Sequence, residues 1–442
     1  MDETAKLSSG SQTSNLPEFS ELVFDWNQVD PPSCSFEPPS KIILNDETLR
    51  DGLQSPSTLQ PTLAQKQVFL RLLPALGIHS ADIGYAGAGS AALSDVVKLA
   101  ETIRNERLSI EANCAGRTHI DDINPILEAC QRSGLAIRAA LFLGSSPIRQ
   151  LVEGWDLDYL VETATRAIGY ARSQGVEVMF VTEDTTRARP GDLSRLYRAA
   201  ADAGAARVCV SDTVGQATPV GVQRVISFLR KDLDEAGFPA IEIDYHGHRD
   251  RGLDLINNLM ALSAGATRVH ACALGVGERV GNAVMDTLVV NLVLLGWMEA
   301  DLTGLPAYCE LASEMTGFPI ARNYPVVGED AFTTSTGVHA AAVAKAYEMG
   351  EAWLADRIYS AVPAGLVGRE QRILVGPMSG RWNALFWLRQ HGIEESPELV
   401  SAILDVAKRS THVLHDDEAK VAVELAMEKE TVPAGGRKET SV

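Results

Sequence analysis

The stretch AIEIDYHGHRDRG, residues 240–252, joins an alternating apolar run to a group of imidazole and charged side chains. Alternation with a period of two is typical of a β-strand that buries one face. Comparable runs occur at seven other places, at 41–45, 80–85, 108–114, 136–144, 176–184, 206–213 and 267–275. Segments with helical spacing separate these runs, and several of them end in glycine, which is a signal for the end of a helix.

Eight strand–helix units predict an α/β fold, a (β/α)8 TIM barrel over residues 40–295. An open doubly wound sheet is the alternative, and the count of eight favours the barrel. Beyond it we expect a C-terminal helical extension: a linker subdomain at 296–350 that carries His339, then a small helical subdomain at 351–430. Residues 1–39 are expected to form an N-terminal arm and residues 431–442 a disordered tail.

The composition excludes several classes of partner. The chain of 442 residues carries a formal net charge of −19, which argues against a surface for nucleic acid or for anionic membranes. Six scattered cysteines indicate reduced thiols rather than a disulfide framework. The polar, acidic start shows no signal peptide, and no apolar run approaches the ~20 residues of a membrane span. We therefore expect a cytoplasmic protein.

Polar clusters follow the predicted strands, at the end where barrel enzymes place their chemistry. They are NDETLRDG (45–52), NCAGRTH (113–119), TEDTTRAR (182–189), SDTVGQ (211–216), HGHRD (246–250) and GVGERVGN (275–282). Loops are polar in general, which explains any one of these clusters. It explains poorly why six clusters carry arginine, histidine or carboxylate groups on the same side of the barrel.

Two histidines in the cluster after the seventh predicted strand raise the question of a metal. His246 and His248 point to the same side of an extended chain, since strand side chains alternate. Asp51 is a candidate third ligand because the first and seventh strands end on the same rim, and Asn282 offers an amide oxygen or a water-bridged contact. Two histidines, a carboxylate and open positions suit a divalent cation that polarises a bound carbonyl.

The motifs together resemble a metal-dependent barrel family. NDETLRDGLQ (45–54) is similar to the opening signature of the 2-isopropylmalate, homocitrate and citramalate synthases and the related 3-hydroxy-3-methylglutaryl-CoA lyases. HGHRDRG resembles the His-x-His motif of the family, and GVGERVGN, EDTTR (183–187) and SDTVG (211–215) also match in order. The resemblance implies a divalent metal (Mg, Mn or Zn) on Asp51, His246 and His248, with Asn282 as a more variable contact.

The resemblance also assigns catalytic and substrate roles by position. It implies that Arg50 stabilises the enolate or alkoxide oxygen, that Glu183 is a catalytic carboxylate and that Thr213 holds the carboxylate of a 2-oxo acid, with Gln54 as a neighbouring polar contact. His339 matches a histidine that takes part in proton transfer, with Tyr359 as its companion. A simple ion pair remains the plainer interpretation of adjacent Arg50 and Asp51.

Two features favour a synthase over a lyase. The loop LGVGERVGN (274–282) lacks the cysteine of the lyases, and the chain continues into segments that resemble the helical subdomains of the synthases. The expected reaction condenses acetyl-CoA with a 2-oxo acid and releases CoA. In the related synthases the extension packs over the partner's barrel, which implies a homodimer whose site His339 completes in trans. A lyase and a metal-binding paralogue without turnover are the alternatives.

The identity of the 2-oxo acid rests on positions where the chain departs from the family pattern. Leu53 and the small residues 86–89 favour an aliphatic substrate of the isopropylmalate synthase type. A more anionic acid, as in homocitrate, citrate or phosphonomethylmalate synthases, needs a cation. Arg117, Arg149 or Arg249 could supply that cation, although Asp82 would repel an anion if it enters the pocket.

Overall fold

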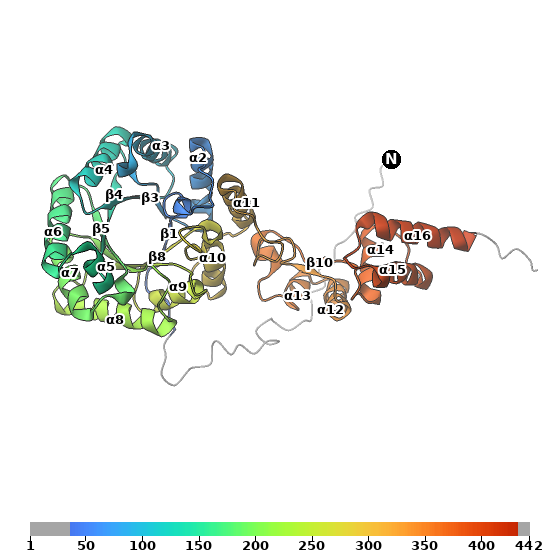
Figure 1. Ribbon diagram of the computed structural model, residues 1–442. Coiled ribbons are helices and arrows are strands. Elements are labelled where there is room, and N and C mark those ends of the chain that lie inside the picture. The colour runs from blue at the N-terminus through green and yellow to red at the C-terminus, as the bar shows by residue number, and fades with distance from the viewer. Residues whose placement is uncertain (1–35, 432–442) are drawn as a thin grey trace, which may run out of the picture. The chain divides into compact units, whose positions relative to one another are not determined.

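The computed structural model describes residues 36–431 (Figure 1). The chain divides into two units, Met1–Glu37 and Pro38–Val442, and every element named below lies in the second. The expected arm at 1–39 and tail at 431–442 lie almost wholly outside the described residues, so both stay predictions.

Eight parallel strands close into a barrel in sequence order, which confirms the predicted (β/α)8 fold and excludes the open sheet (Figure 1). Closure comes from β1 pairing with β8, with Ile43 opposite Arg268 and Asp46 opposite Ala271. The strands are β1 Ile43–Asp46, β2 Ser80–Asp82, β3 Glu111–Arg117, β4 Ile137–Gly144, β5 Val178–Glu183, β6 Arg207–Asp212, β7 Glu242–Gly247 and β8 Arg268–Ala271.

Helices follow the strands and form the outer ring. They are α2 Leu63–Leu72, α3 Ser90–Glu106, α4 Ile120–Ser133, α5 Pro147–Glu153, α6 Leu157–Ser173, α7 Pro190–Asp202, α8 Pro219–Glu235, α9 Asp254–Ser263 and α10 Met285–Leu294. Short sequence motifs determine where these helices begin and end. Thr62 and Gln65 form a capping box at the start of α2, and Gly134 ends α4 in the left-handed conformation. No helix within residues 36–431 is long and apolar enough to cross a membrane.

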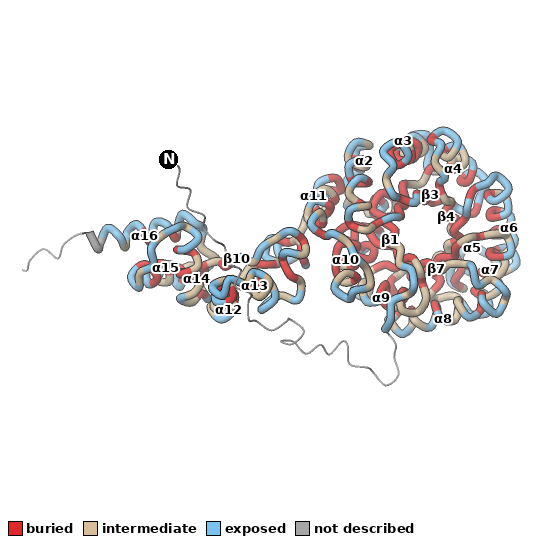
Figure 2. Tube along the Cα trace, turned by 180° about the vertical axis from the view of Figure 1, so that it is seen from behind, coloured by how far each residue is buried: buried red, intermediate tan, exposed pale blue. Residues whose placement is uncertain are grey.

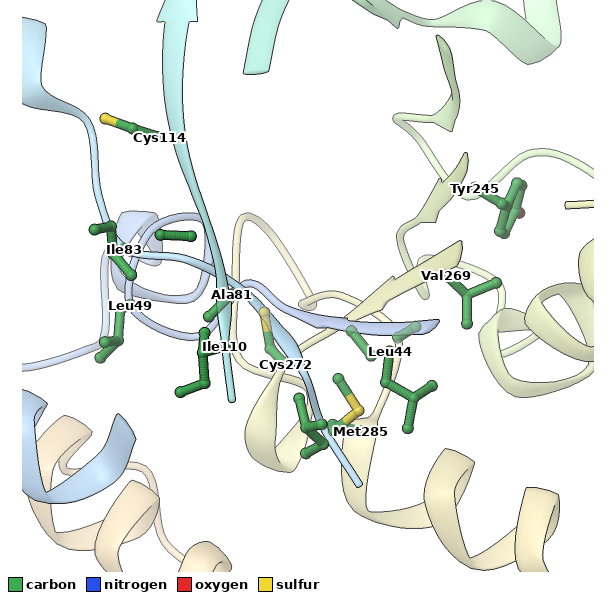
Figure 3. Close-up of a cluster of buried hydrophobic side chains, with 14 of the residues drawn as sticks. Leu44, Leu49, Ala81, Ile83, Ile110, Cys114, Tyr245, Val269, Cys272 and Met285 are labelled. Atoms are coloured by element: carbon green, nitrogen blue, oxygen red, sulfur yellow. The ribbon is translucent and has the colours of Figure 1, made fainter. Parts of the chain in front are cut away.

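Alternation along the strands sends one set of side chains outward to the helices and the other into the barrel. In β7, Ile243 and Tyr245 belong to the apolar core, while Asp244 contacts residues of other strands inside the barrel. Figure 3 shows part of the apolar shell, including Leu44 of β1 and Val269 of β8. Figure 2 shows the burial of each residue along the chain: the strands are largely buried, and the outer faces of the helices are largely exposed.

A buried ionic cluster occupies the barrel interior. Asp244 accepts hydrogen bonds from Arg207 Nε at 2.7 Å and Arg268 Nε at 2.6 Å, and its Oδ2 lies 3.1 Å from His270 Nε2. These four side chains come from β6, β7 and β8 and are at most 2% exposed. Burial raises the pKa of Asp244, but the two guanidinium groups outweigh burial and hold it well below its usual range. Asp244 therefore stays ionised, and its bonds join the three strands.

The extension beyond the barrel is helical, as predicted from the sequence. Its elements are α11 Leu305–Thr316, α12 Gly337–Glu348, α13 Ala352–Arg357, α14 Arg381–Gln390, α15 Pro397–Arg409 and α16 Asp416–Thr431, with a two-stranded sheet of β9 Thr333–Thr334 and β10 Arg372–Ile373. Two small apolar cores hold it together. One forms around Ala340 and Val343 of α12, and the other around Leu388 of α14 and Ile403 of α15.

Candidate active site

A cavity of about 370 Å³ lies at the carboxyl ends of the barrel strands. All eight strands or the loops after them contribute to its lining, as the polar clusters predicted. Eight of the residues predicted from the sequence line it: Arg50, Asp51, Gln54, Asp82, Glu183, Thr213, His246 and His248. The structure therefore brings together groups that are spread over about 200 residues of sequence.

Asp51, His246 and His248 converge within this cavity. The Nε2 atoms of the two histidines lie 3.4 Å apart, and Asp51 Oδ2 is 3.2 Å from His246 Nε2 and 3.7 Å from His248 Nε2. Burial, followed by the neighbouring His246, lowers the pKa of His248 to about 4, so this imidazole is neutral. Asp51 stays ionised, because Arg50 and the histidines outweigh burial and hold its pKa well below the usual range. Neutral imidazole and carboxylate are the forms that bind metals.

Unsatisfied atoms around these three residues also fit a cation. Within the described chain, Asn282 Oδ1 is a buried acceptor without a hydrogen-bond donor. Asn282 lies beside the histidine pair because its backbone forms an antiparallel bridge with His248. Its amide nitrogen is used elsewhere, donating to the carbonyl of Val276 at 3.1 Å. The donor set of two imidazoles, a carboxylate and an amide oxygen therefore suits one divalent ion.

Arg50 lies beside the same cluster and is held by carboxylates. Its Nε donates to Asp82 Oδ2 at 3.1 Å, a terminal nitrogen donates to Glu47, and the other lies 3.7 Å from Asp51. Burial alone lowers the pKa of Arg50, but Glu47, Asp51 and Asp82 raise it well above its usual value. The guanidinium is therefore a fixed positive charge at the edge of the cavity.

Glu47 and His270 line the cavity but were missed by the sequence reasoning. His270 Nδ1 is 3.1 Å from Glu47 Oε1, and its Nε2 faces Asp244. Burial raises the pKa of Glu47, but Arg50 and His270 outweigh it and lower the pKa to about 2. Burial, together with the charge of Glu47, raises the pKa of Asp82 to about 7. Glu47 stands inside the quoted first motif, so its position was visible although its partner on β8 was not.

Glu183 and Thr213 reach the cavity from β5 and from the loop after β6. Burial raises the pKa of Glu183 above its usual value, so its carboxyl holds a proton more readily than it does in water. Thr213 Oγ1 accepts a hydrogen bond from the backbone N–H of Asp184 at 2.8 Å, so its hydroxyl proton remains available to a ligand.

The three arginines expected as substrate contacts do not line the cavity. Arg117 makes two bonds to Asp122, each 2.8 Å long, and its side chain is 62% exposed. Arg149 Nη2 pairs with Glu153 at 3.2 Å, and Arg249 Nε donates to the carbonyl of Val280 at 2.7 Å. A different cation, Arg279 of the GVGERVGN loop, lines the cavity instead and pairs with Asp250 at 2.8 Å.

His339 and Tyr359 form a pair outside the barrel lining. Their rings stack with centroids 4.1 Å apart, and both side chains are exposed. Every residue that lines the cavity lies between Glu47 and Arg279. The roles that the resemblance gives to His339 and Tyr359 therefore stay predictions.

The fold and the cavity together define a TIM-barrel protein with a ligand set for one divalent ion beside a fixed arginine. The model of the HMGL-like family matches residues 41–310, and the chain belongs to that family. This confirms the resemblance based on the motifs. The match covers the whole barrel and extends into α11.

Curated relatives extend the likeness to most of the chain. A homocitrate synthase of Methanocaldococcus jannaschii is 31% identical over 405 residues, covering 90% of this chain and 93% of the relative. A 2-isopropylmalate synthase of Acidimicrobium ferrooxidans is 31% identical over 401 residues, covering 87% and 73%. Among solved structures, an HMG-CoA lyase of Bacillus subtilis has a TM-score of 0.53 at 21% identity and covers 65% of this chain and 97% of its own. This last likeness shows the shared barrel fold.

Proposed function

We propose that this protein condenses acetyl-CoA with an aliphatic 2-oxo acid and hydrolyses the thioester. The observation that carries the proposal is the convergence of Asp51, His246 and His248 beside Arg50 in the cavity. The names of the relatives, which are synthases of homocitrate and 2-isopropylmalate, support the same class of reaction.

The chemistry divides among the residues of the chain. Asp51, His246 and His248 would hold a divalent ion, which would supply Lewis-acid polarisation of a carbonyl oxygen when bound. Arg50 donates hydrogen bonds to the oxygen that gains negative charge as the bond forms. A base, His339 with Glu183 in support, removes a proton from the acetyl methyl group, and the resulting carbanion attacks the ketone carbon of the 2-oxo acid. Water then splits the thioester, giving a carboxylate and the CoA thiol.

The cavity wall supports an aliphatic side chain on the 2-oxo acid. Phe142, Met179 and Val181 line the side formed by β4 and β5, next to the small residues Ala115 and Ala140. Both arginines in the lining are already paired with carboxylates. A second anionic group would have to compete with Asp250 for Arg279 or remain unpaired, and a buried charge without a partner costs several kcal/mol.

A dicarboxylic substrate is the second candidate, and Arg279 is the observation that favours it. Its side chain is 38% exposed at the cavity, so its pairing with Asp250 is open to competition by a ligand. The names of the homocitrate synthase relatives agree with this alternative.

The test measures thiol release from acetyl-CoA by the purified full-length chain with a panel of 2-oxo acids. We expect 2-oxoisovalerate or pyruvate to exceed 2-oxoglutarate and oxaloacetate in kcat/KM by more than tenfold. The reverse preference would establish the dicarboxylic candidate, and Arg279→Ala should then remove it. No thiol release with any 2-oxo acid, combined with acetyl-CoA formation from a hydroxyacyl-CoA, would replace the proposal with a lyase.

Metal dependence is tested with the same assay. A chelator should abolish thiol release, and Mg, Mn or Zn should restore it. Asp51→Asn should lose both the activity and the bound ion, because the ion loses its only carboxylate in this cluster. Asp121→Asn, an exposed change on α4, is the matched control and should retain both.

A further inference from the structure

The loop after α15 and the first turn of α16 carry histidine, histidine and glutamate at a spacing of three, in THVLHDDE (411–418). The segment has a defined conformation. The backbone N–H of Leu414 donates to Val375 at 2.8 Å, and Ala419 at the start of α16 is buried in the core of the small helical subdomain. None of these residues takes part in the barrel cavity.

His412, His415 and Glu418 place three ligand atoms within 4.8 Å of one another. His412 Nε2 lies 3.1 Å from Glu418 Oε2, and the two histidine rings have centroids 5.6 Å apart. The same Glu418 oxygen accepts the backbone N–H of His415 at 2.8 Å. This bond and the contact with His412 lower the pKa of Glu418, so the group is a carboxylate.

Ser410 holds the other side of the His412 ring. Its hydroxyl oxygen lies 3.1 Å from His412 Nδ1 and 2.9 Å from the carbonyl of His412, and it accepts the backbone N–H of His412 at 3.1 Å. The ring is therefore fixed with Nε2 directed at the Glu418 carboxylate, 3.1 Å away. A ring nitrogen and a carboxylate oxygen at this distance share either a proton or a metal ion.

We infer that His412, His415 and Glu418 form a second metal site, specific for a zinc-type ion and separate from the barrel cavity. A proton between His412 and Glu418 would leave the His415 ring unused in the cluster, whereas a metal uses both rings and the carboxylate. Two imidazoles and one carboxylate suit zinc, and the exposure of the cluster leaves room for water as a fourth ligand. Magnesium, which prefers oxygen ligands, should not bind here.

Bound zinc would connect the loop after α15 with the first turn of α16. These two helices already pack against each other in the small subdomain. The ion would therefore act on the stability of this helix pair. This role is independent of the chemistry proposed for the barrel.

The experiment counts zinc ions by calorimetry and by metal analysis after dialysis, on untagged full-length protein stripped with a chelator. In the His246→Ala/His248→Ala background, which removes the barrel ligands, we expect one zinc to remain, and excess magnesium should not displace it. Adding His412→Ala and His415→Ala should remove that ion. Cobalt should give a visible absorption band in the first variant and none in the second. If the barrel substitutions prevent folding, the same difference of one ion is measured against the wild-type chain.

Two further variants test the geometry. Glu418→Gln keeps an oxygen for the His415 N–H but loses the charge, and Ser410→Ala releases the His412 ring; each should weaken zinc binding by roughly tenfold or more. His119→Ala is the matched control, since His119 is exposed beside Asp121 at 3.5 Å but belongs to no three-ligand group of the described chain. An unchanged zinc count in the His412→Ala/His415→Ala protein, or an equal loss in the control, would overturn the inference.

Discussion

Arg50 must keep some of its hydrogen-bond donors free if it is to stabilise a reacting oxygen. A guanidinium has five N–H donors. Glu47 and Asp82 occupy two of them, while Nη1 has only a long contact of 3.7 Å with Asp51. The carboxylates therefore fix the position of the group without using all of its donors. This arrangement suits a preorganised donor to an oxyanion.

Replacing Arg50 with lysine should separate catalysis from binding. An ammonium group keeps the charge but loses the planar fork that Glu47 and Asp82 hold. We expect kcat to fall by ~10²–10³, the scale of losing one oxyanion donor, with a smaller effect on KM. Steady-state kinetics of thiol release give both constants. Arg71→Lys, at an exposed pair with Glu106, is the control, and a change confined to KM would assign Arg50 to substrate positioning instead.

Residues that follow strands were predictable from the sequence, and residues defined by side-chain pairing were not. Asp51, His246 and His248 were found because their places in the strand pattern put them on one rim. The role of Glu47 depends on His270, more than 200 positions away, and no local pattern connects the two. Arg117 and Arg249 were expected near the substrate, but their guanidinium groups donate to Asp122 and to a backbone carbonyl instead. The direction of a long side chain depends on its rotamer, which the sequence does not reveal.

At the scale of elements, the loop between β8 and α10 is shaped by backbone conformations that most residues avoid. Leu274 and Arg279 have φ values of 54° and 56°, and Gly277 and Gly281 have 150° and 109°. Strain of this kind persists only where the surroundings enforce it, and it often occurs at functional sites. The result is that Asn282 lies beside the histidine pair and Arg279 lines the cavity.

Gly281→Ala should disrupt this loop. A Cβ at this position would lie 1.9 Å from the carbonyl oxygen of Gly275, in addition to the cost of positive φ. Gly237→Ala is the matched control, because it has φ 89° but nothing within 4 Å of a Cβ. We expect about 1 kcal/mol of destabilisation in the control and at least 2 kcal/mol more at Gly281. Urea unfolding measures both, and equal losses would show that the loop adjusts freely.

Asp46 of β1 and Tyr308 of α11 connect the barrel to the first helix of the extension. The Tyr308 hydroxyl donates to Asp46 Oδ2 at 2.6 Å, and both residues are buried. Burial raises the pKa of Asp46 to about 6, because the bonds from Tyr308 and Thr48 compensate for it only in part. The folded state therefore binds this proton more tightly than the unfolded chain does.

The stability contributed by protonated Asp46 should be lost as the pH rises from about 4 to above 6. In the Asp46→Asn protein this dependence is absent. The unfolding free energy of the wild type relative to this variant should thus fall by about 2–3 kcal/mol between pH 4 and pH 7.5. Chemical denaturation at several pH values measures it. Tyr308→Phe removes a bond that lowers the pKa and should enlarge the dependence, and a relative stability that rises with pH would contradict the assignment.

For the whole molecule, the central question is whether one chain completes its own site. Among residues 36–431 the cavity is lined by residues of the barrel, whereas His339 lies on α12 with Tyr359 stacked against it. We predict that His339 acts in trans within a homodimer. Mixing inactive His339→Ala and Asp51→Ala subunits should then restore part of the activity, because one of the two sites in a heterodimer has both groups intact. Verified heterodimers without any regain would show that each chain completes its own site.

The architecture was the most predictable part of the protein. Each of the eight runs carries its own alternation and is followed by its own helix, so the count could be made from local signals alone. Closure of the barrel could not be predicted in this way. It depends on the pairing of β1 with β8, in which Ile43 lies opposite Arg268, and these residues are more than 200 positions apart in the sequence. The paired elements β9 and β10 were not predicted, since two residues each are too short for a periodic pattern.

The pairing of β1 with β8 also has a consequence during synthesis on the ribosome. Asp51 is synthesised about 200 residues before His248. The three-residue metal cluster is therefore incomplete until the seventh strand has been made. At the usual ~5–20 residues per second, this interval is on the order of 10–40 s. Throughout it, β1 lacks the β8 strand that pairs with it, and Glu47 lacks its partner His270. Nascent chains halted before residue 240 should therefore be bound by chaperones and cut by proteases far more readily than chains halted after residue 300.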